Sequence, residues 1–161
     1  MSIAENQFLT QDAPSTKMAE AYITIGTRRY SAFHAKNVKV NANVSTQSVP
    51  VLGRTIPGRK ATGMEVKIDM TVYKCTEIFD DLLLNFKKSH VLPTFDLLIA
   101  SEDPATKIGR SSKMYKACVI DGDVLLSMFD SDGNFVEQQI TAYAQDFEPV
   151  ARYTTPSYLK Q

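Results

Sequence analysis

The fold is decided by residues 64–73, which read MEVKIDMTVY. Apolar side chains stand at every second position from Met64 to Val72, and the positions between them carry Glu, Lys, Asp, Thr and Tyr. This alternation predicts a β-strand with one face on a core and the other in water. The stretch is also longer than the common strand of about five or six residues.

A second alternating strand precedes it, with Val38, Val40, Ala42 and Val44 on one face and Lys39, Asn41, Asn43 and Ser45 on the other. Between the two strands, residues 46–63 break the pattern with Pro50, Gly53, Pro57, Gly58 and Gly63. We expect a loop across this whole segment. Because connections in compact domains usually have about four to six residues, so long a loop suggests a function.

The rest of the chain predicts one helix and several shorter strands. The helix follows Thr76 as N-cap, with Asp80 near its start, Lys87 near its end, and an apolar stripe of Ile78, Phe79, Leu82, Leu83 and Phe86. Strands are expected over residues 22–25, 94–100, 113–120 and 135–143, with a hairpin turn at 131–134 before the last. The apolar run 124–129 has no assignment. The fold class is therefore mainly β, with one packed helix.

Composition places the chain among soluble, single-domain proteins. It has 161 residues, of which 43% are hydrophobic and 22% charged. It has no apolar run of the roughly 18 residues that a membrane helix needs and no signal-peptide pattern at its start, so we expect no membrane anchor and synthesis in the cytoplasm. Cys75 and Cys118 are interpreted as free thiols, and two distant histidines, His34 and His90, give no zinc site.

The net charge is zero, but the charges are segregated along the chain. Residues 21–64 contain basic side chains and no acid: Arg28, Arg29, Lys36, Lys39, Arg54, Arg59 and Lys60. Residues 119–150 contain acids and no Lys or Arg: Asp121, Asp123, Asp130, Asp132, Glu137, Asp146 and Glu148. Such complementary halves could pair within one subunit or between copies arranged head to tail, and both alternatives stay open.

Three motif-like segments do not support catalysis or cofactor binding. Residues 53–60 resemble a phosphate-binding loop, but Arg59 separates the second glycine from Lys60 and a strand follows. Residues 130–134 place a glycine too early for a calcium loop. Adjacent carboxylates at Asp80 and Asp81 point about 100° apart on a helix, which suits solvated acids better than an acid–base pair. We therefore expect no enzyme activity, no cofactor, and neither catalytic nor metal-binding residues.

The order of several fragments resembles the tail tube proteins of contractile phages and phage-tail-like particles, including the PBSX-type prophage and R-type bacteriocins such as the diffocins. The likeness covers about residues 20–153. Its fragments are Leu52-Gly53-Arg54, Gly58 to Gly63, the long strand ending in Thr71-Val72-Tyr73-Lys74, the helix from Phe79 to Lys88, Pro93-Thr94-Phe95, Gly109-Arg110, the strand from Tyr115 to Asp121, and Asp146-Phe147-Glu148-Pro149.

The resemblance implies an antiparallel β-sandwich or barrel subunit with one flanking helix. Its copies would form six-fold rings, complete a shared β-barrel and stack into a hollow tube within a virion or phage-tail-like particle, assembled in the cytoplasm of a bacterial host. The implied partners are further copies of the chain, the tail sheath, baseplate and tape-measure proteins, and DNA in transit, although the sequence leaves open whether the tube passes DNA or only ions.

Residues 1–18 are polar and show no periodicity, which indicates an N-terminal arm that orders on assembly or a loose tail. Neither these residues nor the C-terminal tail over 154–161 share the likeness. For the rest of the chain the resemblance implies a tail tube domain over 19–153 with an inter-ring loop at 46–63, and it assigns roles to residues. The residues expected to contact the next ring are Val51, Leu52, Arg54, Ile56 and Arg59. Those expected to face the lumen are Lys39, Asn41, Asn43, Glu65, Lys67 and Asp69.

Two alternatives remain. The first keeps the fold but places the chain in an Hcp-type secretion tube or an extracellular injection system. The second is a nucleic-acid-binding module built on basic residues 21–64, which would need aromatic side chains between the charges. That stretch contains only Tyr22, Tyr30 and Phe33, so it supports this alternative weakly.

Overall fold

A computed structural model describes residues 19–31, 35–74, 77–102, 104, 109–133 and 135–153. The expected N-terminal arm, the C-terminal tail, Cys75 and the expected N-cap Thr76 lie outside these residues. The chain divides into two compact units, which are described separately: residues 1–33, 95–116 and 147–161 form the first, and residues 34–94 and 117–146 form the second.

The first unit is an antiparallel sheet built on β1 (Ala19–Ile25) and β5 (Phe95–Glu102). β1 also pairs with β2 (Arg28–Ser31) through a tight turn at Gly26, whose positive φ of 62° suits glycine. β5 neighbours the first part of β6 (Arg110–Asp121), which pairs with β8 (Asp146–Ala151). Its core is formed by the following buried side chains: Ile23, Phe95, Leu97, Ala100 and Tyr115.

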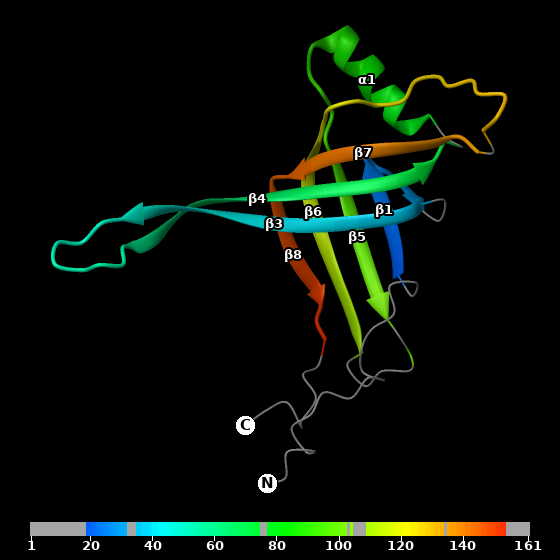
Figure 1. Cartoon of the computed structure of the whole chain (residues 1–161). Coiled ribbons are helices and arrows are strands. Elements are labelled where there is room, and N and C mark those ends of the chain that lie inside the picture. The colour runs from blue at the N-terminus through cyan, green and yellow to red at the C-terminus, as the bar shows by residue number, and fades with distance from the viewer. Residues whose placement is uncertain are drawn as a thin grey trace. The chain divides into compact units, whose positions relative to one another are not determined.

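The second unit is dominated by a long hairpin of β3 (Ala35–Val49) and β4 (Gly58–Tyr73), which projects from the rest of the unit (Figure 1). β4 also pairs with β7 (Glu137–Ala144), and β7 pairs with the last residues of β6. Four of the five apolar side chains that alternate over residues 64–73 lie in the core, and the fifth, Met64, is about half exposed. With residues of β6 and β7 they make up the following set: Val66, Ile68, Met70, Val72, Cys118, Ile120, Ile140 and Ala142.

The predicted helix is α1 (Ile78–Ser89), and it covers the core of the second unit with Phe79 and Leu82. Acids in its first turn and lysines in its last turn complement the helix dipole, as expected. The N-cap residue is Glu77, one position after the expected Thr76, and its side chain caps no backbone N–H. At the other end His90 adopts a left-handed conformation and donates its N–H to the Phe86 carbonyl at 2.8 Å.

The mainly β fold with one helix is confirmed for the described residues, but the prediction of a loop over residues 46–63 is wrong in its extent. β3 continues to Val49 and β4 begins at Gly58, so only residues 50–57 connect them. Both strands are polar and exposed on this outer segment, which hides the alternation that marks a half-buried strand. A register shift after Ser45 interrupts the pairing further.

The chain crosses from the first unit to the second within β6, between Lys116 and Ala117. Ala117 has a positive φ of 52°, in the left-handed region that a Cβ atom disfavours. A single left-handed residue within a strand is typical of a β-bulge, which bends the strand. The crossing point is therefore a position of backbone strain.

Candidate assembly surfaces

One face of the β3–β4 hairpin is polar. The register pairs the six residues expected to face a lumen: Lys39 with Asp69, Asn41 with Lys67, and Asn43 with Glu65. Directly opposed residues of antiparallel strands project from the same side, so these side chains share one face. Asp69 is half-buried and accepts a hydrogen bond from the Thr141 hydroxyl of β7 at 3.1 Å. The polar face thus extends from the hairpin onto β7.

The opposite face of the hairpin is apolar, and the subunit covers only part of it. Ile68 and Met70 are buried in the core of the second unit. Farther along the hairpin, Val44 lies opposite Met64, and about half of each side chain is exposed. The apolar face therefore continues beyond the core that the unit itself can form, which marks a surface that another molecule would cover.

The hairpin ends in residues 50–57, here called the tip. It carries the residues expected to contact a neighbouring ring, apart from Arg59: Val51, Leu52, Arg54 and Ile56. Leu52 is fully exposed and Ile56 is 76% exposed, while the Arg54 N–H donates to the Val51 carbonyl at 3.2 Å. Arg59 lies in β4, where its Nε donates to the Thr46 hydroxyl at 3.0 Å. The tip thus presents apolar and basic side chains to solvent.

Residues 122–136, here called the β6–β7 loop, form a second exposed apolar surface. Their large exposed side chains are Leu126, Met128, Phe129, Phe135 and Val136. Phe135 meets Tyr73 edge to face, with ring centroids 6.2 Å apart. A hollow of about 170 Å³ lies among Met128, Phe129, Phe135 and the backbone around them. Phe129 itself is 96% exposed.

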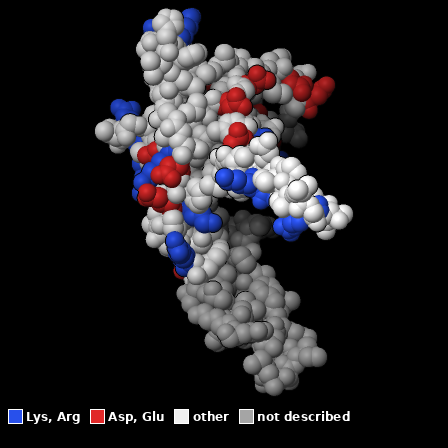
Figure 2. Space-filling view, turned by 90° about the vertical axis from the view of Figure 1, so that its left-hand side faces the viewer, with Lys and Arg blue, Asp and Glu red and all other residues white. Residues whose placement is uncertain are grey.

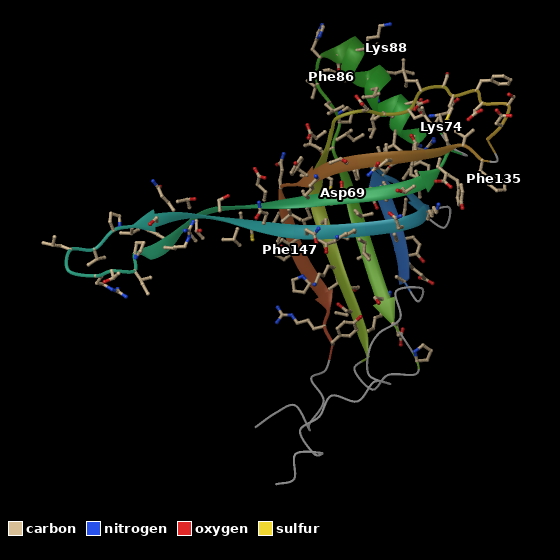
Figure 3. All side chains as sticks on the ribbon, viewed as in Figure 1. Asp69, Lys74, Phe86, Lys88, Phe135 and Phe147 are labelled. Carbon is tan, nitrogen blue, oxygen red and sulfur yellow. The ribbon has the colours of Figure 1, made fainter. Side chains whose placement is uncertain are left out.

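Lys74 fastens both ends of the β6–β7 loop. Its N–H donates to the Val136 carbonyl at 2.8 Å, and its ammonium donates to the Leu125 carbonyl. The ammonium also pairs with Asp80 of α1 at 3.0 Å, in a site where the two side chains are 11% and 16% exposed. Figure 3 shows Lys74 and Phe135 together at the end of β4 that lies away from the tip. The loop is therefore anchored to the folded unit.

A turn over residues 130–133 lies within the β6–β7 loop where the sequence predicted one over 131–134, of which Asn134 is outside the described residues, and β7 starts at Glu137 instead of Phe135. The Asp130 carboxylate accepts a hydrogen bond from the Asp132 N–H at 3.0 Å, and the Asp130 carbonyl accepts one from Gly133 at 3.3 Å. These bonds are typical of an Asx turn. The expected direct hairpin turn is thus wrong, because a longer loop surrounds it.

The two charge-segregated segments pair within the subunit only in part. Lys36 and Glu137 form an exposed ion pair at 3.4 Å in the second unit. Neither Arg54 nor Lys60 has an acidic partner among the described residues. The outer part of the hairpin, residues 46–63, contains Arg54, Arg59 and Lys60 and no Asp or Glu, and in Figure 2 the projecting end of the molecule carries Lys and Arg. The positive charge of the hairpin therefore remains available to another molecule.

The described residues offer no group of three or more His, Cys, Asp or Glu side chains placed to hold a metal ion. Among them, no helix has the length and apolar character to span a bilayer. Cys118 is buried and is not part of a disulfide. The surfaces that distinguish this chain are therefore the hairpin, its tip and the β6–β7 loop.

Comparison with known proteins agrees with this arrangement. The model of the phage tail tube protein family matches residues 6–150. The chain belongs to that family. The match begins 14 residues before the segment from which the resemblance was drawn and ends three residues before its end. It favours a phage-type tail tube over a secretion-system tube or a nucleic-acid-binding module.

Individual relatives of this tail tube protein are distant. The protein XkdM of the phage-like element PBSX of Bacillus subtilis is 25% identical over 116 residues, which are 71% of this chain and 78% of XkdM. Among solved structures, one similar chain comes from the PVC sheath/tube terminator of an extracellular contractile injection system in its extended state. It superposes with a TM-score of 0.57 at 14% sequence identity, and the match covers 81% of this chain and 93% of that chain. A chain of the anti-feeding prophage baseplate, 6-fold symmetrised, gives 0.56 at 7% identity, over 89% and 94%.

Sequence reasoning missed the apolar surface of the β6–β7 loop. Its signal was the run 124–129, which has no assignment because it shows neither strand nor helix periodicity. Apolar side chains flanked by Asp123 and Asp130 and placed outside any regular element are typical of a contact surface. That combination was the available clue.

Proposed function

We propose that this tail tube protein stacks as six-subunit rings into the hollow inner tube of a contractile phage-type particle. The anti-feeding prophage baseplate, which contains a chain of the same fold, is a six-fold symmetrised assembly. The observation that carries the proposal is the projecting β3–β4 hairpin, with one polar face, one incompletely covered apolar face and an exposed tip.

The polar face of the hairpin suits the wall of a water-filled lumen. It joins acids and bases in register, for example Lys39 opposite Asp69. Neighbouring charges of opposite sign keep the surface hydrated without producing a strong field of one sign. The proposed lumen would therefore let charged cargo slide without holding it.

Rings would close through strand edges. β3 ends the strand order of the second unit, and within the described residues it pairs with β4 alone. An edge strand of 15 residues presents unpaired N–H and C=O groups, which natural monomers usually avoid. Pairing of this edge with a neighbouring subunit would satisfy those groups and extend the sheet into a shared barrel.

Rings would stack through the tip, where Leu52 and Ile56 are exposed. Sheath and baseplate proteins are the proposed outer and terminal partners, because chains of this fold occur in a prophage baseplate and in the sheath/tube terminator of an injection system. Contact with a tape-measure protein and passage of DNA belong to the same proposal and follow from a lumen of this kind.

Negative-stain electron microscopy of the purified chain at high concentration tests the proposal. We expect hollow rings or cylinders of uniform width. Because a tube of this kind can require a baseplate to nucleate its assembly, a second sample would contain the baseplate components of the same particle. Particles that stay monomeric in both samples would contradict the proposal.

A further inference from the structure

We infer that the β6–β7 loop is the surface on which the hairpin tip of a second copy docks. This inference rests on the proposed function, since it names the partner surface of the ring-bridging tip. The occupant is a second copy of the same chain, and the contact is heterologous: the tip of one subunit meets the loop of the next.

The two surfaces lie at opposite ends of the same strand. The tip precedes Gly58, the first residue of β4, and the loop is fastened to Lys74, directly after the last residue, Tyr73. The 16 residues of β4 span about 50 Å at about 3.3 Å per residue. A subunit's own tip therefore cannot reach its own loop, whereas successive copies placed end to end bring each tip to the next loop. A contact of this type repeats without limit and builds a filament or a stack.

The apolar parts of the two surfaces complement each other in shape. The hollow of about 170 Å³ beside Met128, Phe129 and Phe135 is open to solvent on one side, so a side chain of another molecule can enter it. One aliphatic side chain of the tip fits such a space, and Leu52 is the most exposed candidate. Exposed aromatic side chains around a pocket are also typical of the energetic centre of an interface.

The charges complement each other as well. The tip and the adjacent β4 residues contribute Arg54, Arg59 and Lys60, and sequence 21–64 holds no acid. The loop contributes the exposed Asp123 and Asp132, within a stretch that holds no Lys or Arg. Opposite charges steer the encounter of the two surfaces and disfavour docking of a tip on another tip. Copies that dock in this way form a stack in which every subunit points in the same direction.

The loop is prepared for this role by its anchor. Lys74 binds the loop backbone at Leu125 and Val136, so both ends of the loop are held in place before a partner arrives. A preorganised surface loses less conformational freedom on binding, which favours affinity. Asp130 orders the intervening turn through its bonds to Asp132 and Gly133.

Photo-crosslinking identifies the docking surface directly. Tubes are assembled from native chains mixed with a small fraction of chains carrying p-benzoylphenylalanine at position 52 or, as a polar alternative, at Thr55. Native and probe chains carry different nitrogen isotopes, so that mass spectrometry separates links between copies from links within one. We expect links between copies from the tip to residues 122–136, and a probe at Leu84 of α1 should give none there. Links from the tip that fall consistently on other segments would overturn the inference.

A charge exchange tests the same contact without a probe. The hairpin variant carries Arg54→Glu and Lys60→Glu, and the loop variant carries Asp123→Lys and Asp132→Lys, which leaves Asp130 and its turn intact. Each variant should raise the concentration needed for tube formation roughly tenfold, and combining all four changes should restore it. If the hairpin variant fails to assemble while the loop variant assembles normally, the tip bridges rings on another surface and only this inference is wrong. If both assemble like the native chain, the ring-bridging role of the tip fails too.

Discussion

Replacing Leu52 by Ala separates assembly from folding more cleanly than any other single change in this chain. Leu52 is fully exposed in the subunit, so its truncation removes no contact from the subunit core. Exposed substitutions away from structural features usually change the free energy of unfolding by no more than about 0.5 kcal/mol. For a chain of this size that corresponds to a change in Tm of only about 1–2 °C.

The effect on assembly should be much larger. Leu→Ala removes three carbon atoms, worth about 0.8 kcal/mol each when fully buried, or about 2.4 kcal/mol for each subunit contact. If the interface buries only half of this surface, about 1.2 kcal/mol remains, which is roughly an eightfold weakening of each contact. In a ring of six the contacts act together, so the free energy of adding one ring falls by about 7 kcal/mol even at half burial.

The assay is sedimentation of assembled tubes over a concentration series, with electron microscopy of the pellets. Leu52→Ala should shift the onset of assembly to clearly higher concentration while thermal unfolding stays unchanged. The matched control is Leu84→Ala on α1, an aliphatic residue about half exposed and outside the hairpin. Equal onset concentrations for the native chain and Leu52→Ala would refute the reasoning, as would an equal shift in both variants.

Three further predictions concern the subunit itself. Lys74→Met should lower the free energy of unfolding by about 3 kcal/mol, measured by denaturant unfolding, because it leaves the nearly buried Asp80 without its partner. A smaller loss would show that water takes the place of the ammonium group. Gln138→Met should raise the free energy of unfolding by about 1 kcal/mol in the same assay, since Gln138 is only 4% exposed and its Oε1 has no hydrogen-bond partner. A less stable variant would contradict this prediction. Ala117→Gly should raise Tm through about 1 kcal/mol of relieved left-handed strain, a gain that disappears if the bulge does not persist in solution.

The elements that bury one face were predictable from the sequence, and the hairpin's outer half was not. Residues 66–72 alternate because water lies on one side of β4 and the core on the other, and α1 shows its stripe for the same reason. In the outer part of the hairpin, residues 46–63, both faces are exposed, so no buried face requires apolar side chains at every second position. Pro50 and Pro57 mark the true connection, but the glycines at 58 and 63 made the whole segment look like loop.

The proposed lumen surface could be predicted from the sequence, and the position of the β6–β7 loop could not. Two alternating strands predict which side chains share a face, and the register then pairs Lys39 with Asp69 as that reasoning requires. The structure adds the register between these two consecutive strands. By contrast, nothing local indicates that residues 122–136 meet the end of β4, because Lys74 fixes them through backbone carbonyls that any sequence possesses.

The second unit has two surfaces of a kind that stable monomers avoid: exposed apolar side chains at the ends of its strands, and an open strand edge at its side. Along the strands, exposed apolar side chains stand at both ends, Leu52 at the tip and Phe129 in the β6–β7 loop. Across the strands, the outer edge of β3 is left open. A contact across the strands repeats sideways and closes a ring, whereas a head-to-tail contact along them repeats from ring to ring. Two such heterologous contacts in different directions generate a cylinder, and neither alone can do so. On this reasoning a variant that blocks the β3 edge should abolish rings and tubes alike, while a variant of the tip should leave rings that do not stack.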